Sequence, residues 1–170
     1  MTYVNYGING NTISAYPNPD SVPISERYKD MLNDFDIVGF EGGRNDYNKN
    51  IPIGLDSDID NTTFKGALNV LCQGMIKKYL GKKIFGVPCW ALSTNKNGAG
   101  ATQNDYLEAF VHIVSDIWGI PVLDSRSSGI YMNSKDFLEK YTEDGNSISH
   151  LNAAGHVLYS AKVSKFIQGL

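Results

Sequence analysis

Three separated segments of the sequence carry residues that could stabilise and protonate a reacting group. Asn45 follows an apolar run through a double glycine, so its side-chain amide projects from a tight turn as a hydrogen-bond donor. Gly10 lies in a polar turn, where its backbone N–H has no side chain to block an approaching group. Donors of these two kinds can stabilise an oxyanion. His150 stands just before an expected helix, where its imidazole is suited to act as a general base.

Each segment also has a purely structural interpretation. Gly-Gly-Arg-Asn-Asp and Asn-Gly are common tight turns, and a single histidine before a helix can simply cap it or pack against it. The combination of the three segments, in this order and after expected strands, is therefore more informative than any one of them.

The same segments resemble three sequence blocks of the SGNH (GDSL-type) hydrolase superfamily. The likeness runs from Tyr3 to Ile167 and is closest to small bacterial or phage-associated members. It implies a flavodoxin-like three-layer α/β/α sandwich that hydrolyses carboxylic esters through Ser, His and usually Asp. It also implies that Gly10 and Asn45 are oxyanion donors and that His150 is the base. The matching blocks are Asn5–Thr12, Glu41–Tyr47, and Asp144–Gly145 followed by His150–His156.

Two residues of the family pattern are missing here. Family members begin with a strand that ends in Gly-Asp-Ser and supplies the nucleophile, and this tripeptide does not occur in the sequence. The nearest hydroxyls, Thr12 and Ser14, follow the wrong turn, and we expect neither to be the nucleophile. The family's orienting aspartate stands three residues before the histidine, where this chain has Ser147. We expect Asp144 to orient the ring of His150 instead, the alternative being a backbone carbonyl.

The missing block is also a missing strand. In a flavodoxin-like sheet of order 2-1-3-4-5 the first strand is central, and its loss leaves buried backbone groups unpaired at about 1–3 kcal/mol each. Three arrangements would repair this. The expected strand Tyr3–Ile8 pairs directly with Asp36–Phe40, a partner chain or a second copy donates a strand, or Met1 is internal to a longer protein. We thus expect one SGNH-hydrolase-like domain over residues 1–170, incomplete at its N-terminus.

The elements that must position these residues follow from alternating β-like runs and helical patterns, which predict an α/β fold with a parallel sheet. Ligands bind at the carboxyl ends of such strands, where the polar turns lie. The expected strands are Tyr3–Ile8, Asp36–Phe40, Lys83–Trp90 and Ile120–Asp124. The expected helices are Ile24–Asn33 with Ser25 as its cap, a long helix from Thr62 or Thr63 to Gly81, one after Thr102, Ser134–Tyr141 and Asn152–Gln168.

Composition excludes several classes of function. A net charge of −3 without a basic block argues against nucleic-acid binding, and no apolar stretch reaches the roughly 18 residues that span a bilayer. Without an evident signal segment the chain as written is expected to be cytoplasmic, with Cys72 and Cys89 as free buried thiols. We expect no cofactor and no metal. Gly98–Thr102 lacks the third glycine of a dinucleotide-binding loop and the lysine of a P-loop, so a flexible rim loop is the better interpretation. His150 and His156 are poorly spaced for chelating a metal.

The favoured hypothesis is a serine esterase domain that acts on a carboxylic ester such as an acetylated carbohydrate or a short acyl ester. Because the nucleophilic serine is absent, we expect little activity from this chain alone. The alternative is a non-catalytic pseudoenzyme that binds carbohydrate or ester ligands. Tyr47, Trp90 and Tyr131 could stack on sugars beside the site, although aromatic residues at strand ends are more often part of a core.

Overall fold

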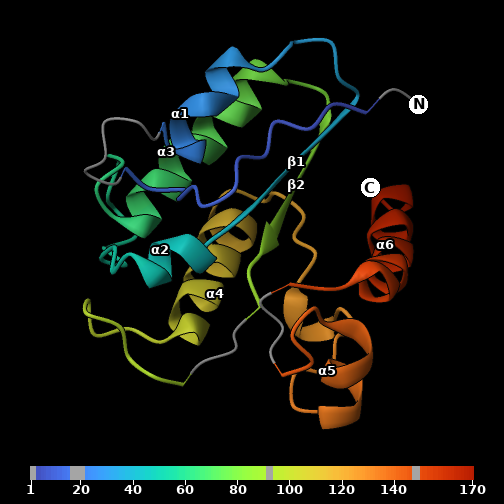
Figure 1. The fold of residues 1–170 in the computed structure, drawn as a ribbon. Helices are drawn as coiled ribbons and strands as arrows, with labels where there is room; N and C mark the ends of the chain where they lie inside the picture. Colours follow the sequence, from blue (N-terminus) through green and yellow to red (C-terminus); the bar gives the residue numbers. More distant parts are fainter. Residues whose placement is uncertain (1–2, 16–21, 91–93, 147–149) are drawn as a thin grey trace.

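The computed structural model describes residues 3–15, 22–90, 94–146 and 150–170, and Figure 1 shows the course of the chain. Helices account for most of the regular structure, with two strands between them. In chain order the elements are α1 (Ile24–Arg27) with a 3₁₀ turn (Tyr28–Asp30), β1 (Ile37–Gly42), α2 (Arg44–Asn48), α3 (Phe64–Lys78), β2 (Lys83–Pro88), α4 (Gln103–Val111) continued by a π-helix (His112–Ile117), a 3₁₀ turn (Ser125–Ser127), α5 (Lys135–Tyr141) and α6 (Ala153–Gln168).

A small parallel sheet lies at the centre of this mixed α/β fold. β1 pairs with β2 in a register that sets Ile37 opposite Lys83 and Gly42 opposite Pro88. Val122 adds a single parallel bridge to Gly86. In the described part of the chain no strand pairs with the second edge of β1. Because the two strands are parallel, their carboxyl ends lie at the same edge of the sheet, beside α2.

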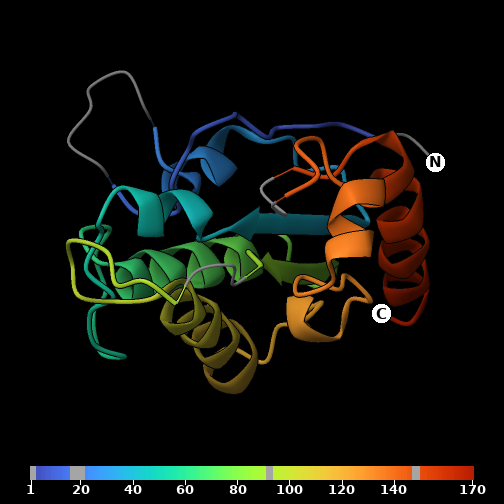
Figure 2. The ribbon, with the colours of Figure 1, turned by 60° about the horizontal axis from the view of Figure 1, so that its bottom comes forward.

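One face of the sheet packs on α3 and α4, which Figure 2 shows together on the same side of the strands. The alternation of side chains along β1 sends Val38 and Phe40 into this core, and the ring of Phe40 lies 5.7 Å from that of Phe110 on α4. On the other face, Phe85 of β2 contacts Phe166 of α6 with ring centroids 5.7 Å apart. The two faces thus have different helical partners.

Four helices begin with a capping side chain, and the cap of α3 is one that the sequence predicts. Thr63 accepts a hydrogen bond from the backbone of the first turn of α3, and Thr102 forms a reciprocal capping box with Asp105 at α4. The side chains of Ser134 and Asn152 each accept one hydrogen bond from the first turn of α5 and α6. These caps satisfy N–H groups that a helix start leaves without a partner, which is why they locate the starts well.

Several expected elements are wrong. Tyr3–Ile8 is not a strand, because no neighbouring strand is present to pair with it in the described residues, and Ile120–Asp124 contributes only its bridge at Val122. The expected helix Ile24–Asn33 stops earlier, and Pro23 rather than Ser25 precedes its first turn, so Ser25 lies inside the helix. The segment after β1, expected to be turn and loop, contains the short helix α2.

Other expectations concern the cysteines and the membrane. Cys72 and Cys89 are free and buried, as predicted, and burial raises the pKa of each thiol to about 12. Over the described ranges, no helix combines the length and apolar character that crossing a bilayer requires.

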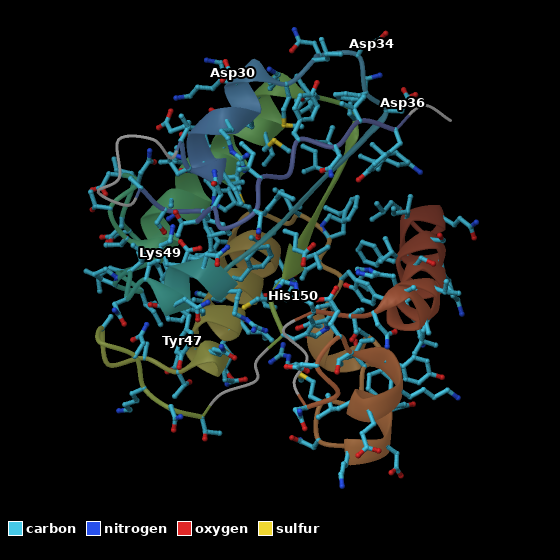
Figure 3. The ribbon with its side chains drawn as sticks, viewed as in Figure 1. Asp30, Asp34, Asp36, Tyr47, Lys49 and His150 are labelled. Carbon is cyan, nitrogen blue, oxygen red and sulfur yellow. The ribbon has the colours of Figure 1, made fainter. Side chains whose placement is uncertain are left out.

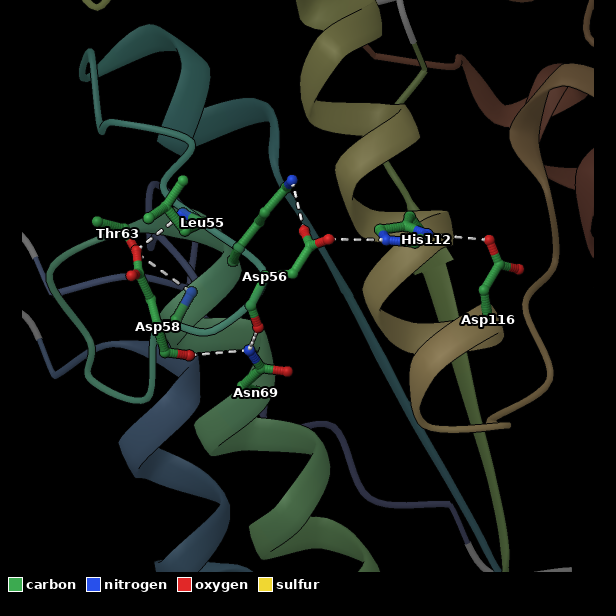
Figure 4. A network of polar contacts seen from close by, with 9 residues as sticks. Leu55, Asp56, Asp58, Thr63, Asn69, His112 and Asp116 are labelled. Atoms are coloured by element: carbon green, nitrogen blue, oxygen red, sulfur yellow. Dashed lines mark hydrogen bonds and ion pairs between the residues drawn. The ribbon is translucent and has the colours of Figure 1, made fainter.

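A polar network ties the loop before α3 to the π-helix (Figure 4). The ring of His112 lies 3.1 Å from Asp116 and 3.2 Å from Asp56, and Asp56 also pairs with Lys65 at 2.7 Å. Hydrogen bonds to Asp116 and then Asp56 raise the pKa of His112 above its ordinary value. The protonated imidazole therefore bridges two carboxylates from different segments.

This network predicts a pH-dependent contribution to stability. Because the pKa of His112 is raised by folding, the contribution is full below the ordinary value near about 6.5 and is lost as pH rises through the folded value. In urea unfolding, His112→Gln should cost more free energy at about pH 5.5 than at about pH 8.5. Asp116→Asn should weaken that pH dependence. An equal cost of His112→Gln at both pH values would contradict the assignment.

Candidate functional site

The double glycine after β1 turns the chain sharply into α2. Gly43 precedes the first turn of α2 with a φ of 111°, a conformation that L side chains rarely adopt. A Cβ at this position would also lie 3.3 Å from both Cys89 Sγ and the ring of Phe64. The glycine thus places Asn45, in the first turn of α2, directly beyond the carboxyl end of β1.

Two side chains, one from α2 and one from the residue that follows it, hold the turn that contains Gly10. Asn45 Nδ2 donates to the carbonyl of Asn11 at 2.9 Å, and Lys49 Nζ donates to the carbonyl of Gly10 at 3.0 Å. Residues four apart on a helix lie on the same side, so both donors reach consecutive carbonyls. The structure therefore brings the Gly10 turn and Asn45 together, as the hypothesis of a shared site requires.

Two N–H groups at this junction, one of the Asn45 amide and one of the Gly10 backbone, are available for further hydrogen bonds. The Asn45 amide has two N–H groups, and its hydrogen bond to Asn11 uses one of them. Among the described residues no hydrogen bond uses the backbone N–H of Gly10, whose φ of 77° belongs to an open turn with no atom within 4 Å of a Cβ placed there. Both groups can thus donate to a third atom.

The hydroxyls nearest to this junction are already engaged. Thr12 Oγ1 is buried and donates to the carbonyl of Ser14 at 2.6 Å. Ser14 Oγ is fully buried and donates to the carboxylate of Asp46 at 2.6 Å. Both hydroxyls are thus buried and donate to acceptors within the protein.

His150 lies on a polar loop whose two ends are joined. Thr142 and Leu151 form an antiparallel bridge, and the Glu143 N–H donates to the His150 carbonyl at 3.1 Å. Asn152, which caps α6, also donates to the carbonyl of Thr142 at 3.1 Å. The backbone of His150 is fixed by this closure, and its side chain is exposed.

The loop of His150 is connected to the ends of both strands. Leu151 belongs to a small apolar cluster against which Trp90 and Tyr159 pack. Trp90 follows β2, and its carbonyl accepts a hydrogen bond from Arg44 of α2 at 3.2 Å. Figure 3 shows Tyr47, Lys49 and His150 beyond the carboxyl ends of the strands, opposite to Asp30, Asp34 and Asp36.

Asp144 accepts hydrogen bonds within the loop that also carries His150. Its Oδ1 accepts from the backbone of Asn146 at 3.0 Å and from Thr142 Oγ1 at 3.3 Å. No hydrogen bond joins the ring of His150 to another residue in the ranges that the structure describes. Ser147, which occupies the family's aspartate position, lies outside the described residues. Asp144 and His150 thus lie on the same loop, and the orientation of the ring by Asp144 stays a prediction.

The aromatic residues proposed for the rim have different surroundings. Trp90 stacks edge-on against Tyr159 with ring centroids 5.2 Å apart, so much of its surface is in the core. Tyr47 donates from its hydroxyl to the carbonyl of Asn95 at 3.1 Å. Tyr131 is 65% exposed and is the most accessible of the three candidates.

The glycine-rich loop before α4 has little capacity to bind an anion. Asn97 Oδ1 accepts from the N–H groups of Ala99 and Ala101, while Gly98 N–H donates to Asn50. Gly100 N–H donates to the Asn97 carbonyl. With these amides occupied, the loop is an organised rim rather than a phosphate cradle. The described residues also hold no cluster of three potential metal ligands.

Three buried donors near the strand ends have no acceptor among the described residues. They are Arg44 Nε, Trp90 Nε1 and Tyr159 Oη. Burial lowers the pKa of Arg44 and raises the pKa of Tyr159 to about 12. An unsatisfied buried donor costs about 1–3 kcal/mol. This side of the site therefore favours an incoming group that carries hydrogen-bond acceptors.

Two residues of the site were missed from the sequence, Asp46 and Lys49. Asp46 lies on α2 and Lys49 directly follows it, in a segment that was expected to be turn and loop. The spacing of Asn45 and Lys49 was the available signal, because residues four apart share a helix face. The burial of Asp46 had no signal in the sequence, where Asp following Asn is typical of an exposed turn.

Comparison with known proteins identifies the fold. No model of a known protein family matches the sequence, and neither does any curated protein. Among solved structures, a protein from Lactobacillus plantarum superimposes with a TM-score of 0.84 at 27% identity, over 97% of this chain and 80% of its own.

Two further solved structures, both designated GDSL-like lipases, resemble the chain more distantly. The one from Bacteroides ovatus has a TM-score of 0.65 at 18% identity, over 95% of this chain and 69% of its own. The one from Bacteroides uniformis has a TM-score of 0.61 at 17% identity, over 95% and 67%. The chain therefore has an SGNH/GDSL-like fold.

The left-handed conformation of Gly10 gives a testable consequence. Gly10→Ala should destabilise the protein by about 1 kcal/mol, because an L side chain is disfavoured at this positive φ. Gly10→Asn should cost less, since asparagine tolerates the left-handed region. Urea unfolding measures both, with Asn9→Ala in the same turn as the control. Equal stability of all three variants and the parent would contradict the described turn.

Proposed function

We propose that this chain provides most of an SGNH-type serine esterase, acting on a carboxylic ester such as an acetylated carbohydrate or a short acyl ester. The observation that carries the proposal is the junction of the Gly10 turn with Asn45, held by the Asn45–Asn11 hydrogen bond. This junction offers one backbone and one side-chain donor beyond the carboxyl end of β1. The fold similarity to GDSL-like lipases agrees with this assignment.

The two donors would act on the charge that develops during acyl transfer. When an alkoxide attacks the ester carbonyl, the carbonyl oxygen becomes an oxyanion. The Gly10 N–H and the second N–H of Asn45 Nδ2 would donate to it. Donors fixed before the reaction are effective because they need no reorganisation when the charge appears.

His150 would transfer the proton in this mechanism. Its ring takes the proton of the attacking serine hydroxyl as the new C–O bond forms, and returns it to the alcohol oxygen as the old ester bond breaks. Water then repeats the sequence on the acyl-enzyme and releases the acid. Asp144 would orient the ring once the loop rearranges around it, because both residues lie on the segment closed by Thr142 and Leu151.

The serine would come from an extended segment that pairs with the edge of β1 at which the described residues place no strand. This segment would belong to polypeptide beyond these residues, to a partner chain, or to a second copy. The face of β1 that carries Gly39 and Glu41 is exposed, and Val157 on α6 is 72% exposed. A strand at this edge would extend the sheet towards a three-layer α/β/α sandwich. It would also bring acceptors towards Arg44 and the other unsatisfied donors.

Hydrolysis of an aryl acetate tests the proposal. The chain alone should show little activity, and addition of an upstream strand that ends in Gly-Asp-Ser should restore turnover. In that complete form, Asn45→Ala should lower kcat by about 10²–10³-fold, as removal of one oxyanion donor does. His150→Ala should reduce activity at least as much, whereas His156→Ala, at another exposed histidine, should not.

Two results would decide against this function. Robust hydrolysis by the chain alone, abolished by Asn45→Ala, would show that the nucleophile lies within these residues. Saturable binding of an acetylated sugar, weakened by His150→Ala but without turnover or reaction with a fluorophosphonate probe in the complete form, would support a non-catalytic binding module.

A further inference from the structure

Asp46 is a fully buried acid beside the proposed oxyanion donors. Its Oδ2 accepts from the N–H of Ile13 at 3.0 Å, and its Oδ1 accepts from the N–H of Ser14 at 2.9 Å and from Ser14 Oγ at 2.6 Å. All three donors belong to one short segment of the N-terminal chain. The carboxylate thus attaches α2 to that segment at two consecutive backbone positions.

Burying the Asp46 carboxylate lowers the stability of the fold unless all of its hydrogen bonds are made. Desolvation by burial raises the pKa of Asp46, and the hydrogen bonds from Ser14 and Ile13 oppose that effect. If the carboxylate moved away, two buried N–H groups would lose their acceptor together. The contact therefore favours a single position of the segment relative to α2.

The segment held by Asp46 continues directly into the proposed oxyanion hole. Asn11 lies two residues before Ile13 and provides the carbonyl that receives the Asn45 amide. Asn45 itself is the residue before Asp46 on α2. One carboxylate therefore fixes the separation between the segment that carries the backbone donor and the helix that carries the amide donor.

We propose that Asp46 is a positioning residue of the esterase site, which sets the relative placement of the Gly10 and Asn45 donors without touching the substrate. This inference rests on the proposed function. A misplacement of about 1 Å can lower a rate by about 10²-fold, because oxyanion donors act only in the correct geometry. The expected effect of disturbing Asp46 is thus on kcat rather than on substrate binding.

The first test uses the complete form, with the Gly-Asp-Ser strand supplied. Asp46→Asn keeps the size of the side chain but replaces one accepting oxygen by an NH₂ group. That group would face an N–H or O–H of Ile13 or Ser14 instead of accepting from it. It should lower kcat by about 10²-fold and leave KM within about twofold. Ser14→Ala removes one of the three bonds and should give a smaller decrease in kcat.

A matched control separates positioning from general destabilisation. Asn69 on α3 also makes three hydrogen bonds, to the carbonyls of Asp56 and Asp58 and from Trp118 Nε1, and is 7% exposed. Asn69→Ala should lower the unfolding temperature without changing kcat when both variants are assayed while folded. Equal kcat values for Asp46→Asn and Asn69→Ala would overturn the inference.

The second test uses the chain as it is and needs no activity. In NMR spectra, Asp46→Asn should shift the side-chain amide resonances of Asn45 and raise the exchange rate of its bonded proton, whereas Asn69→Ala should not. Unchanged Asn45 resonances in Asp46→Asn would overturn the inference. If Asn45→Ala leaves the activity of the complete form intact, the proposed function fails, and the NMR comparison still decides whether Asp46 positions Asn45.

Discussion

Asp46 buries its carboxylate against the backbone of Ile13 and Ser14, and the placement of the N-terminal segment depends on this contact. Within the described ranges, no strand pairing holds that segment to the sheet. Asn45 of α2 and Lys49, which follows α2, also donate to carbonyls of this segment. Thr12 and Ile13 in turn accept from the backbone of Ile24 and Ser25. Because a buried carboxylate requires satisfied hydrogen bonds, a five-residue helix can fix a long extended segment.

The other side of the site is less complete than this junction. β1 has a hydrogen-bonded neighbour on one edge in the described chain, and its outer face exposes Gly39 and Glu41. Nearby, Arg44, Trp90 and Tyr159 each bury a donor without a described acceptor. Open edges and unsatisfied donors both lower stability, and one inserted segment would relieve both.

The helices could be predicted well because their starts depend on local chemistry. Thr63, Thr102, Ser134 and Asn152 each cap a helix with their own side chain, and the cap acts within three residues of sequence. Strands depend on partners that are distant in sequence, so the extended pattern of Tyr3–Ile8 predicted a strand that has no neighbour to pair with. The short helix α2 was missed for a related reason: its start requires a left-handed glycine at Gly43, with Phe64 and Cys89 leaving little room for a Cβ there.

The sequence by itself determined the fold class, most helix positions and the residues Gly10, Asn45 and His150 as candidates for one site, because turn glycines, caps and motif order are local. Only the tertiary structure decided which of them meet. It joined Asn45 to the Gly10 turn and placed Asp144 on the loop that also carries His150. It also assigned a role to Asp46, since burial and hydrogen bonding are fixed by segments more than thirty residues away.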